Sequence, residues 1–163
     1  MVEEGDRAPA FAVNDQTGKK VSLTDFKGKI VVIYFYPKDD TPGCTVEACS
    51  LRDSFTSVKK TGATVLGVSC DNEKSHRKFI EKYSLPFALL ADTDKSVANA
   101  YDVWKEKSFY GKTFMGVART TFIIDGKGIV KKVFRNVKPE DHAQEILDAI
   151  KKMKKTKGKG NKR

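Results

Sequence analysis

Apolar residues follow two different periods along the chain, and each period predicts one kind of element. Uninterrupted apolar runs predict buried strands, whereas apolar residues that recur at spacings of three and four predict one-sided helices. Residues 30–36 form a run without polar alternation, so we expect a central strand covered on both faces. The predicted strands are Ile30–Tyr36, Val65–Cys70, Phe87–Ala91, Thr120–Asp125 and Ile129–Phe134. The predicted helices run over 44–58, 73–83, 96–103 and from Pro139 to about Met153.

Turn-forming residues connect these elements. Asn14–Gly18 joins two short strands, Ala8–Val13 and Lys20–Leu23, in an N-terminal hairpin, and Gly126–Gly128 marks another hairpin. Residues 104–117 carry several aromatic side chains and two glycines, which predict a long loop that either walls a pocket or covers a sheet edge. The order of elements is typical of an α/β fold: a thioredoxin-like sandwich with a central mixed β-sheet flanked by helices and an N-terminal β-hairpin.

Composition and charge divide the chain into one domain and a tail. A chain of 163 residues with 39% hydrophobic residues is long enough for one domain with a substantial core. The net charge is +10, but residues 151–163 hold eight of the 31 basic residues and no acidic one. The rest has 23 basic against 21 acidic residues, which is nearly neutral. We therefore expect a domain over 1–153 and a basic, disordered tail over 154–163.

The two ends of the chain suggest where the protein acts. The first residues, MVEEGD, are acidic and polar, unlike a signal or transit peptide, and no apolar run is long enough to span a bilayer. We expect a cytoplasmic protein without membrane contact. The lysine-rich tail is either a solvated end or a weak electrostatic contact with nucleic-acid phosphates, which allows nuclear or nucleoid association.

One short stretch, Pro37–Cys49, brings reactive chemistry to this scaffold. It follows the central apolar run and leads into a helix, so Cys44 falls at a helix start where backbone N–H groups and the helix dipole favour a thiolate. Three cysteines are too few, and odd in number, for a disulfide framework. We therefore interpret Cys44 as a nucleophile that its site makes reactive.

The same stretch resembles a known family. Pro37-x-x-x-Thr41-x-x-Cys44 is similar to the active-site signature of the peroxiredoxins. Cys49, five residues later, resembles the bacterioferritin comigratory protein (peroxiredoxin Q) branch, and the segment 118–122, ARTTF, extends the likeness to the second half of the chain. The resemblance spans Gly5 to about Met153.

The resemblance implies a thiol-dependent peroxidase with two redox-active cysteines. Cys44 would reduce hydrogen peroxide and organic hydroperoxides and become a sulfenic acid. Cys49 would then form a disulfide with Cys44, which thioredoxin or a glutaredoxin-like dithiol protein would reduce. The resemblance also implies a monomer. On an ideal helix, Cα atoms five residues apart lie roughly 8.6 Å apart, beyond the ~7 Å limit for a disulfide, so the helix start must unwind.

Four further residues are candidates for the site, and each has an alternative role. The Thr41 hydroxyl is placed to bond the thiolate or a peroxide oxygen, or it caps the helix. Arg119 would stabilise the thiolate and the developing oxyanion, although alone it would be a strand-edge charge. Glu47 lies one turn after Cys44 and orients Arg119, or is a simple first-turn acid. Pro37 shields the sulfur from water, or only ends the strand.

Other residues exclude competing classes of site. Cys70 ends a buried strand and is interpreted as an inert thiol, with a resolving role as the minor alternative. His76 and His142 lie on separate helices without paired cysteines, so no metal site is predicted, and the absence of a Gly-rich phosphate loop predicts no nucleotide or other cofactor. The alternative functions are a thioredoxin-like disulfide oxidoreductase, although the chain lacks Cys-x-x-Cys, and a nucleic-acid-associated protein acting through its tail.

Overall fold

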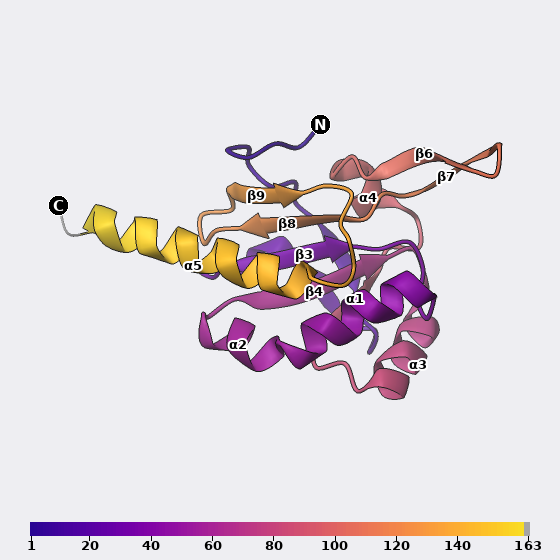
Figure 1. Cartoon of the computed structure of the whole chain (residues 1–163), viewed down its shortest axis with the longest axis horizontal. Helices are drawn as coiled ribbons and strands as arrows, with labels where there is room; N and C mark the ends of the chain where they lie inside the picture. The colour runs from indigo at the N-terminus through magenta and orange to yellow at the C-terminus, as the bar shows by residue number, and fades with distance from the viewer. Residues whose placement is uncertain (162–163) are drawn as a thin grey trace.

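A computed structural model describes the backbone of residues 1–161 and side chains as far as Lys154 (Figure 1). Its main feature is a five-stranded sheet with the strand order β5-β4-β3-β8-β9. The strands are β3 (Val31–Phe35), β4 (Thr64–Ser69), β5 (Ala88–Ala91), β8 (Thr120–Ile124) and β9 (Val130–Phe134). β3 pairs in parallel with β4 and antiparallel with β8, so the apolar run expected to be central lies in the middle of a mixed sheet.

Helices cover one face of the sheet, and a mixed layer covers the other. The helical face carries α1 (Pro42–Asp53), α2 (Phe55–Lys60), α3 (Glu73–Tyr83) and α5 (His142–Asn161). The opposite face carries α4 (Ser96–Ala100), the 3-10 helix η1 (Leu23–Phe26) and the hairpin of β1 (Ala12–Asn14) and β2 (Lys20–Ser22). All five residues of β3 are buried because both faces are covered. The thioredoxin-like sandwich with an N-terminal hairpin is therefore confirmed.

The helix predicted over 44–58 is two helices in the structure. α1 ends at Asp53 and α2 begins at Phe55, with Ser54 between them at a non-helical φ of −99° and ψ of 4°. Leu51 and Val58 still pack into the same core cluster on either side of this break. The apolar spacing identified the correct buried face, because a short break between helices hardly alters which side chains reach the sheet.

The segment predicted to be a long loop is a third hairpin. β6 (Trp104–Phe109) pairs antiparallel with β7 (Lys112–Val117) around Tyr110 and Gly111, whose φ angles are 51° and 76°. Two consecutive positive φ angles are typical of the type I′ turns that match the twist of paired strands. Tyrosine is unusual at the first position of such a turn, so the sequence carries only a weak signal for a hairpin. The hairpin projects from the body (Figure 1).

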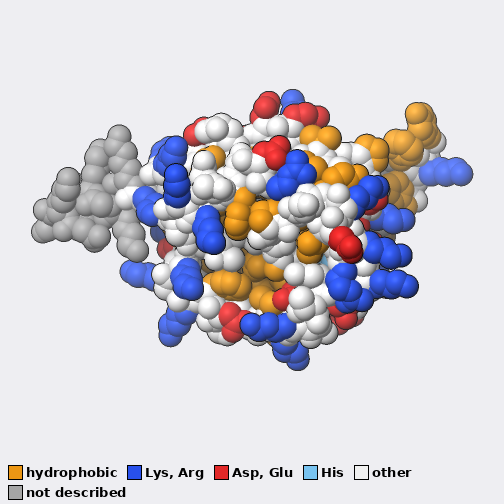
Figure 2. Space-filling model, turned by 90° about the horizontal axis from the view of Figure 1, so that it is seen from below, with side chains coloured by type: hydrophobic (Ala, Val, Ile, Leu, Met, Phe, Trp, Pro, Cys, Tyr) orange, Lys and Arg blue, Asp and Glu red, His pale blue; other side chains and the backbone are white. Residues whose placement is uncertain are grey.

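The tip of this hairpin exposes large apolar side chains at one end of the molecule (Figure 2). Phe109, Phe114 and Met115 are each about half exposed or more, and Tyr110 is 91% exposed. Trp104, at the base, packs against the core instead. The prediction that this segment is a loop was therefore wrong, and only its base contributes to the core.

The C-terminal helix differs from its prediction at both ends. α5 begins at His142 rather than Pro139, and residues 139–141 form a turn before it. The backbone continues as helix to Asn161, into the segment for which we expected disorder, because residues that extend an existing helix need no new nucleation. Lys162 and Arg163 lie outside the described residues. No helix within the described residues is long and apolar enough to cross a membrane.

Candidate active site

Cys44 lies in the first turn of α1, where the chain leaves the central strand. Thr41 is the extended N-cap residue, and Pro42, which has no N–H to leave unpaired, is the first helical residue. Asp40 makes the sharp turn before them with a φ of 55°. The Cys44 side chain is only 1% exposed and packs against the core under the helix. The strand–turn–helix arrangement predicted around Cys44 is therefore present.

Arg119 reaches Cys44 from a distant part of the chain. It precedes β8, and its guanidinium Nη2 donates to Cys44 Sγ at 3.4 Å. The Arg119 main chain is fixed by the N–H of Val137, which donates to its carbonyl. Burial lowers the pKa of Arg119, but negative charge at Cys44 and Glu47 offsets this effect and raises it overall. A positive charge beside the sulfur favours a thiolate and any oxyanion that forms next to it.

Glu47 holds the other side of the same guanidinium. Its Oε1 accepts from Arg119 Nη1 at 2.8 Å, while Oε2 has no hydrogen-bond partner among the described residues. The Glu47 side chain is completely buried, and burial raises its pKa to about 7 although Arg119 acts in the opposite direction. The structure thus brings Cys44, Glu47 and Arg119 together, because the guanidinium that contacts Cys44 also bonds to Glu47.

Thr41 and Pro37 lie in the loop before α1, and the Thr41 hydroxyl makes a different contact from either one expected. The Thr41 hydroxyl donates to the Lys38 carbonyl at 2.9 Å, and within the described residues it neither caps the helix nor bonds to the Cys44 sulfur. Because its proton is engaged, it offers an incoming peroxide O–H only its lone pairs. Pro37 is half-buried directly after Tyr36, where it begins the turn.

Cys49 stands apart from Cys44 on the same helix. Both cysteines are free thiols, and α1 is continuous from Pro42 to Asp53. Five helical residues correspond to about 140° of rotation and roughly 7.5 Å of rise, so the two side chains leave the helix in different directions. The structure does not bring Cys49 to Cys44, and a bond between them requires α1 to open.

The remaining cysteine and the histidines do not form a second reactive site. Burial, followed by the charge of Asp92, raises the pKa of the Cys70 thiol to about 11, so it is un-ionised at neutral pH. His76 and His142 are fully buried and hydrogen-bonded on different elements. Within residues 1–154, no group of three or more His, Cys, Asp or Glu side chains could hold a metal.

Three residues near the site were not identified from the sequence. Gly43 lies so close to Arg119 that a Cβ there would stand 3.1 Å from Nη2. Lys107, on the β6–β7 hairpin, has a pKa lowered by partial burial and then by the charge of Arg119, while Cys44 acts in the opposite direction. The buried Tyr34 hydroxyl lacks a partner within the described part of the chain. Only Gly43, directly before the cysteine, carried a local signal: a small residue at the start of a helix.

Known proteins are similar in sequence to this chain over almost its whole length. A model described as the AhpC/TSA family matches residues 4–133. The chain is 48% identical over 152 residues to Peroxiredoxin Bcp of Bacillus subtilis, covering 93% of this chain and 97% of that protein. It is 47% identical over 150 residues to Peroxiredoxin Bcp of Escherichia coli, covering 92% of this chain and 96% of that protein.

Solved structures give the same picture. The chain superposes on peroxiredoxin Q of Xanthomonas campestris with a TM-score of 0.84 at 38% identity, covering 93% of this chain and 96% of that one. It also matches the bacterioferritin comigratory protein of the same organism, in work on its alkyl peroxide reduction activity. There the TM-score is 0.86 at 37% identity, with 94% of this chain and 98% of the other covered.

Proposed function

The chain belongs to the AhpC/TSA family as a thiol-dependent peroxiredoxin of the Bcp branch, and we propose that Cys44 is the cysteine that attacks the peroxide. The observation that carries this assignment is the contact between Arg119 Nη2 and Cys44 Sγ at 3.4 Å. A buried sulfur at a helix start, with a guanidinium aimed at it, is suited to react as a thiolate.

The proposed first step is a displacement at oxygen. The Cys44 thiolate attacks the terminal peroxide oxygen, so that an S–O bond forms while the O–O bond breaks. Cys44 is oxidised to a sulfenic acid, and the peroxide is reduced to water or an alcohol after the leaving oxyanion takes a proton. Arg119 stabilises negative charge first on sulfur and then on the departing oxygen, and Glu47 fixes the orientation of its guanidinium.

Hydrogen peroxide and organic hydroperoxides are the proposed substrates. The alkyl peroxide reduction activity named for the X. campestris relative supports the second class. The Thr41 hydroxyl supports a common mode of binding, because its free lone pairs can accept the terminal O–H that every hydroperoxide carries.

Cys49 is the proposed resolving cysteine. Its thiolate would attack the sulfur of the Cys44 sulfenic acid, forming the disulfide and releasing water. This step requires the first turns of α1 to unwind, because the two Cα atoms are too far apart on an intact helix. A dithiol protein such as thioredoxin or a glutaredoxin-like protein would then reduce the disulfide.

Trapping the intermediates tests this route. The reduced protein is treated with one equivalent of hydrogen peroxide and alkylated, and the masses of its peptides are measured. A Cys44–Cys49 disulfide is expected in the wild type, and a Cys44 sulfenic acid, captured by a dimedone-type reagent, in Cys49→Ser. Cys70→Ser is the matched control and should behave as the wild type. Peroxide consumption that persists in Cys44→Ser would refute the assignment of Cys44.

Three further expectations stay predictions. We propose a monomer in the cytoplasm, and we retain weak nucleic-acid contact through residues 154–163 as a separate property of the C-terminal end. The side chains from 155 onward lie outside the described residues. DNA affinity that falls steeply with salt and disappears on deletion of 154–163 would support the contact, and salt-independent binding would contradict it.

A further inference from the structure

The loop that leads into α1 is bound to α3 through a buried carboxylate. Asp39 Oδ1 accepts from the Tyr36 hydroxyl at 2.6 Å, and its Oδ2 accepts from the Ser75 hydroxyl at 2.8 Å. His76 Nδ1 lies 2.7 Å from the same Oδ2. Burial raises the pKa of Tyr36 well above its ordinary value, with the charge of Asp39 contributing, so the phenol remains a donor. Asp39 therefore receives three side-chain donors.

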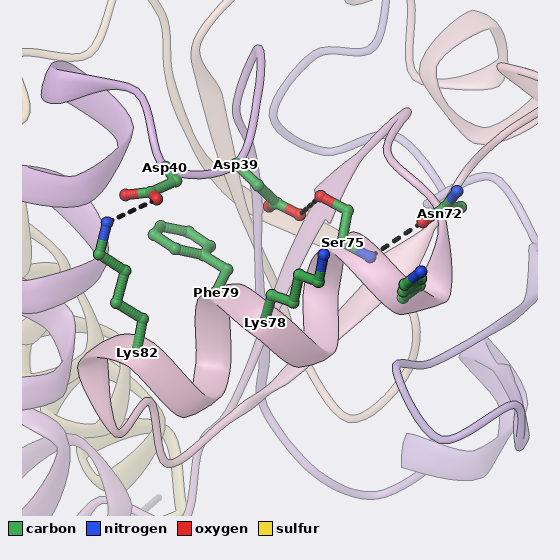
Figure 3. Close-up of a pocket in the computed structure, with 8 residues that line it drawn as sticks. Asp39, Asp40, Asn72, Ser75, Lys78, Phe79 and Lys82 are labelled. Carbon is green, nitrogen blue, oxygen red and sulfur yellow. Dashed lines mark hydrogen bonds and ion pairs between the residues drawn. The ribbon is translucent and has the colours of Figure 1, made fainter.

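The next residue makes a second attachment to the same helix. Asp40 accepts from Lys82 Nζ at 2.8 Å and from the Tyr83 hydroxyl at 2.9 Å. Both attachments line a cleft of about 500 Å³ that Phe79 also lines. In Figure 3 the Asp40–Lys82 bond lies at one end of the residues drawn, and the Asp39–Ser75 bond lies between it and Asn72 at the other end. α3 thus holds two consecutive loop residues, of which Asp39 is buried and Asp40 exposed.

The main chain of the loop is anchored as well. The Asp39 N–H donates to Asp71 Oδ2 at 2.8 Å, and the Ser69 hydroxyl donates to the same oxygen at 2.7 Å. Asp71 follows β4, which is a central strand of the sheet. Both the carboxylate and the amide of Asp39 are therefore fixed to rigid elements, five residues before Cys44.

The His76 ring lies between two oxygen acceptors. The ring is completely buried, with Nδ1 facing the Asp39 carboxylate and Nε2 facing the Leu90 carbonyl at 2.9 Å. Both oxygens are acceptors, so each ring nitrogen lies within hydrogen-bond distance of an acceptor, and the shorter of the two contacts is the one to Asp39. The charged groups near the pair are Asp71 after β4, the Asp40–Lys82 pair, and Lys74 and Lys78, which line the same cleft as Asp39. Of the charged groups among the described residues, only Asp39 bonds to the ring.

We infer that His76 is a positioning residue of the peroxidase: through its bond to Asp39, it holds the loop 37–41 against α3 while Cys44 meets the peroxide. This inference rests on the proposed Cys44–Cys49 route. With the loop held, only residues after Thr41 can rearrange when α1 opens. Freeing the loop lengthens the segment that can move, beginning at Pro37. The pair therefore favours attack on peroxide and slows disulfide formation.

Separate measurement of the two steps tests the inference. Rapid quenching with alkylating and sulfenic-acid reagents gives the rate of Cys44 oxidation and the rate of disulfide formation in the full chain. The His76→Gln variant has no imidazole ring, so one amide cannot replace both the contact to Asp39 and the contact to the Leu90 carbonyl. His76→Gln should slow the first step about tenfold, which is the effect of losing a charge-assisted hydrogen bond, and accelerate the second several-fold.

A matched control separates positioning from general loss of stability. Asp92 is a fully buried carboxylate that accepts from the N–H groups of Val97 and Ala98 at the start of α4, on the other face of the sheet. Asp92→Asn removes a buried charge without touching the loop and should leave the ratio of the two rates unchanged. Rates that fall together in His76→Gln, or that stay at wild-type values, would overturn the inference.

Two further measurements do not depend on that variant folding. Nitrogen NMR of the reduced wild type should show a His76 ring N–H at Nδ1 that exchanges slowly with solvent, as a buried bond to Asp39 requires, and a rapidly exchanging ring N–H would overturn the inference. Ser75→Ala, which removes one donor to Asp39, should shift the two rates in the same directions by a smaller factor. A wild type that forms no Cys44–Cys49 disulfide refutes the proposed route instead, and leaves the NMR result as evidence on the His76–Asp39 bond.

Discussion

Glu47 and Arg119 form a buried ion pair in which one carboxylate oxygen is bonded and the other is not. Oε1 lies 2.8 Å from Nη1, whereas Oε2 has no partner within the described residues. The second guanidinium nitrogen, Nη2, remains directed at Cys44. The pair thus fixes Arg119 while only partly satisfying the acid, and this imbalance has measurable consequences for activity and stability.

Replacing Arg119 should affect the peroxide step more than any other step. Arg119→Ala removes the cation next to the sulfur, so the second-order rate constant for peroxide should fall by about 10²–10³. The rate constant should fall less in Arg119→Lys, because an ammonium keeps the positive charge. It should still fall, because an ammonium cannot contact both Cys44 and Glu47 in a fixed geometry. Stopped-flow fluorescence of the single Trp104 measures the rate.

Arg135 provides the control for this prediction. It bonds to the Val2 carbonyl and lies 3.7 Å from Glu3, away from Cys44. Arg135→Ala should keep the wild-type rate constant. An Arg119→Ala variant that is folded and reacts with peroxide as fast as the wild type would remove the electrostatic role of Arg119.

Glu47 should make the folded state less stable as the pH rises through neutrality. Burial raises its folded pKa to about 7 from an ordinary value of 4.5, so its stabilising contribution is complete below pH 4.5 and is lost as the pH rises through 7. A shift of this size corresponds to about 3 kcal/mol. The unfolding free energy of the wild type, relative to Glu47→Gln, should therefore decline between pH 5 and pH 8 by up to that amount.

Urea unfolding across this pH range measures the difference. Glu81→Gln is the matched control because Glu81 is an exposed carboxylate on α3, and it should follow the wild-type curve. A constant difference between the wild type and Glu47→Gln from pH 5 to pH 8 would contradict a raised pKa in the folded protein.

Gly43 should matter because its missing side chain leaves room for Arg119, and not because of its backbone conformation. It has no positive φ angle, yet a Cβ at this position would stand 3.1 Å from Arg119 Nη2. Gly43→Ala should therefore displace the guanidinium by a few tenths of an ångström and slow the peroxide step several-fold, with little loss of stability, since alanine suits a helix. Ser57→Ala, exposed on α2, is the control. Unchanged kinetics in Gly43→Ala would show that Arg119 adjusts freely.

The central strand and the helix start at Cys44 could be predicted because local patterns determine them. An apolar run without alternation can only be buried on both faces, as β3 is, and Thr41-Pro42 marks a helix start. Arg119 could be connected with Cys44 only through the family resemblance, since 75 residues separate them. Its partnership with Glu47 was one of two alternatives that the spacing allowed.

Other features depend on contacts that no local pattern reveals. Asp39 and His76 lie 37 residues apart and meet only because the loop before α1 crosses the start of α3. The strands β6 and β7 lack a buried apolar face over most of their length, so periodicity could not distinguish them from a loop. The Thr41 hydroxyl bonds to the Lys38 carbonyl, a contact within the loop that the sequence pattern did not indicate.

The β6–β7 hairpin should depend on glycine at its turn. Gly111 has a φ of 76°, and a Cβ added there would meet no atom within 4 Å, so a substitution has only a backbone cost. Gly111→Ala should weaken the hairpin by about 1 kcal/mol, and Gly111→Asn by less, because asparagine tolerates the left-handed region. Amide hydrogen exchange of Lys107 and Phe114, which pair across the hairpin, should accelerate about fivefold in the alanine variant. Equal exchange in all three proteins would mean that the segment behaves as the loop that its sequence pattern predicts.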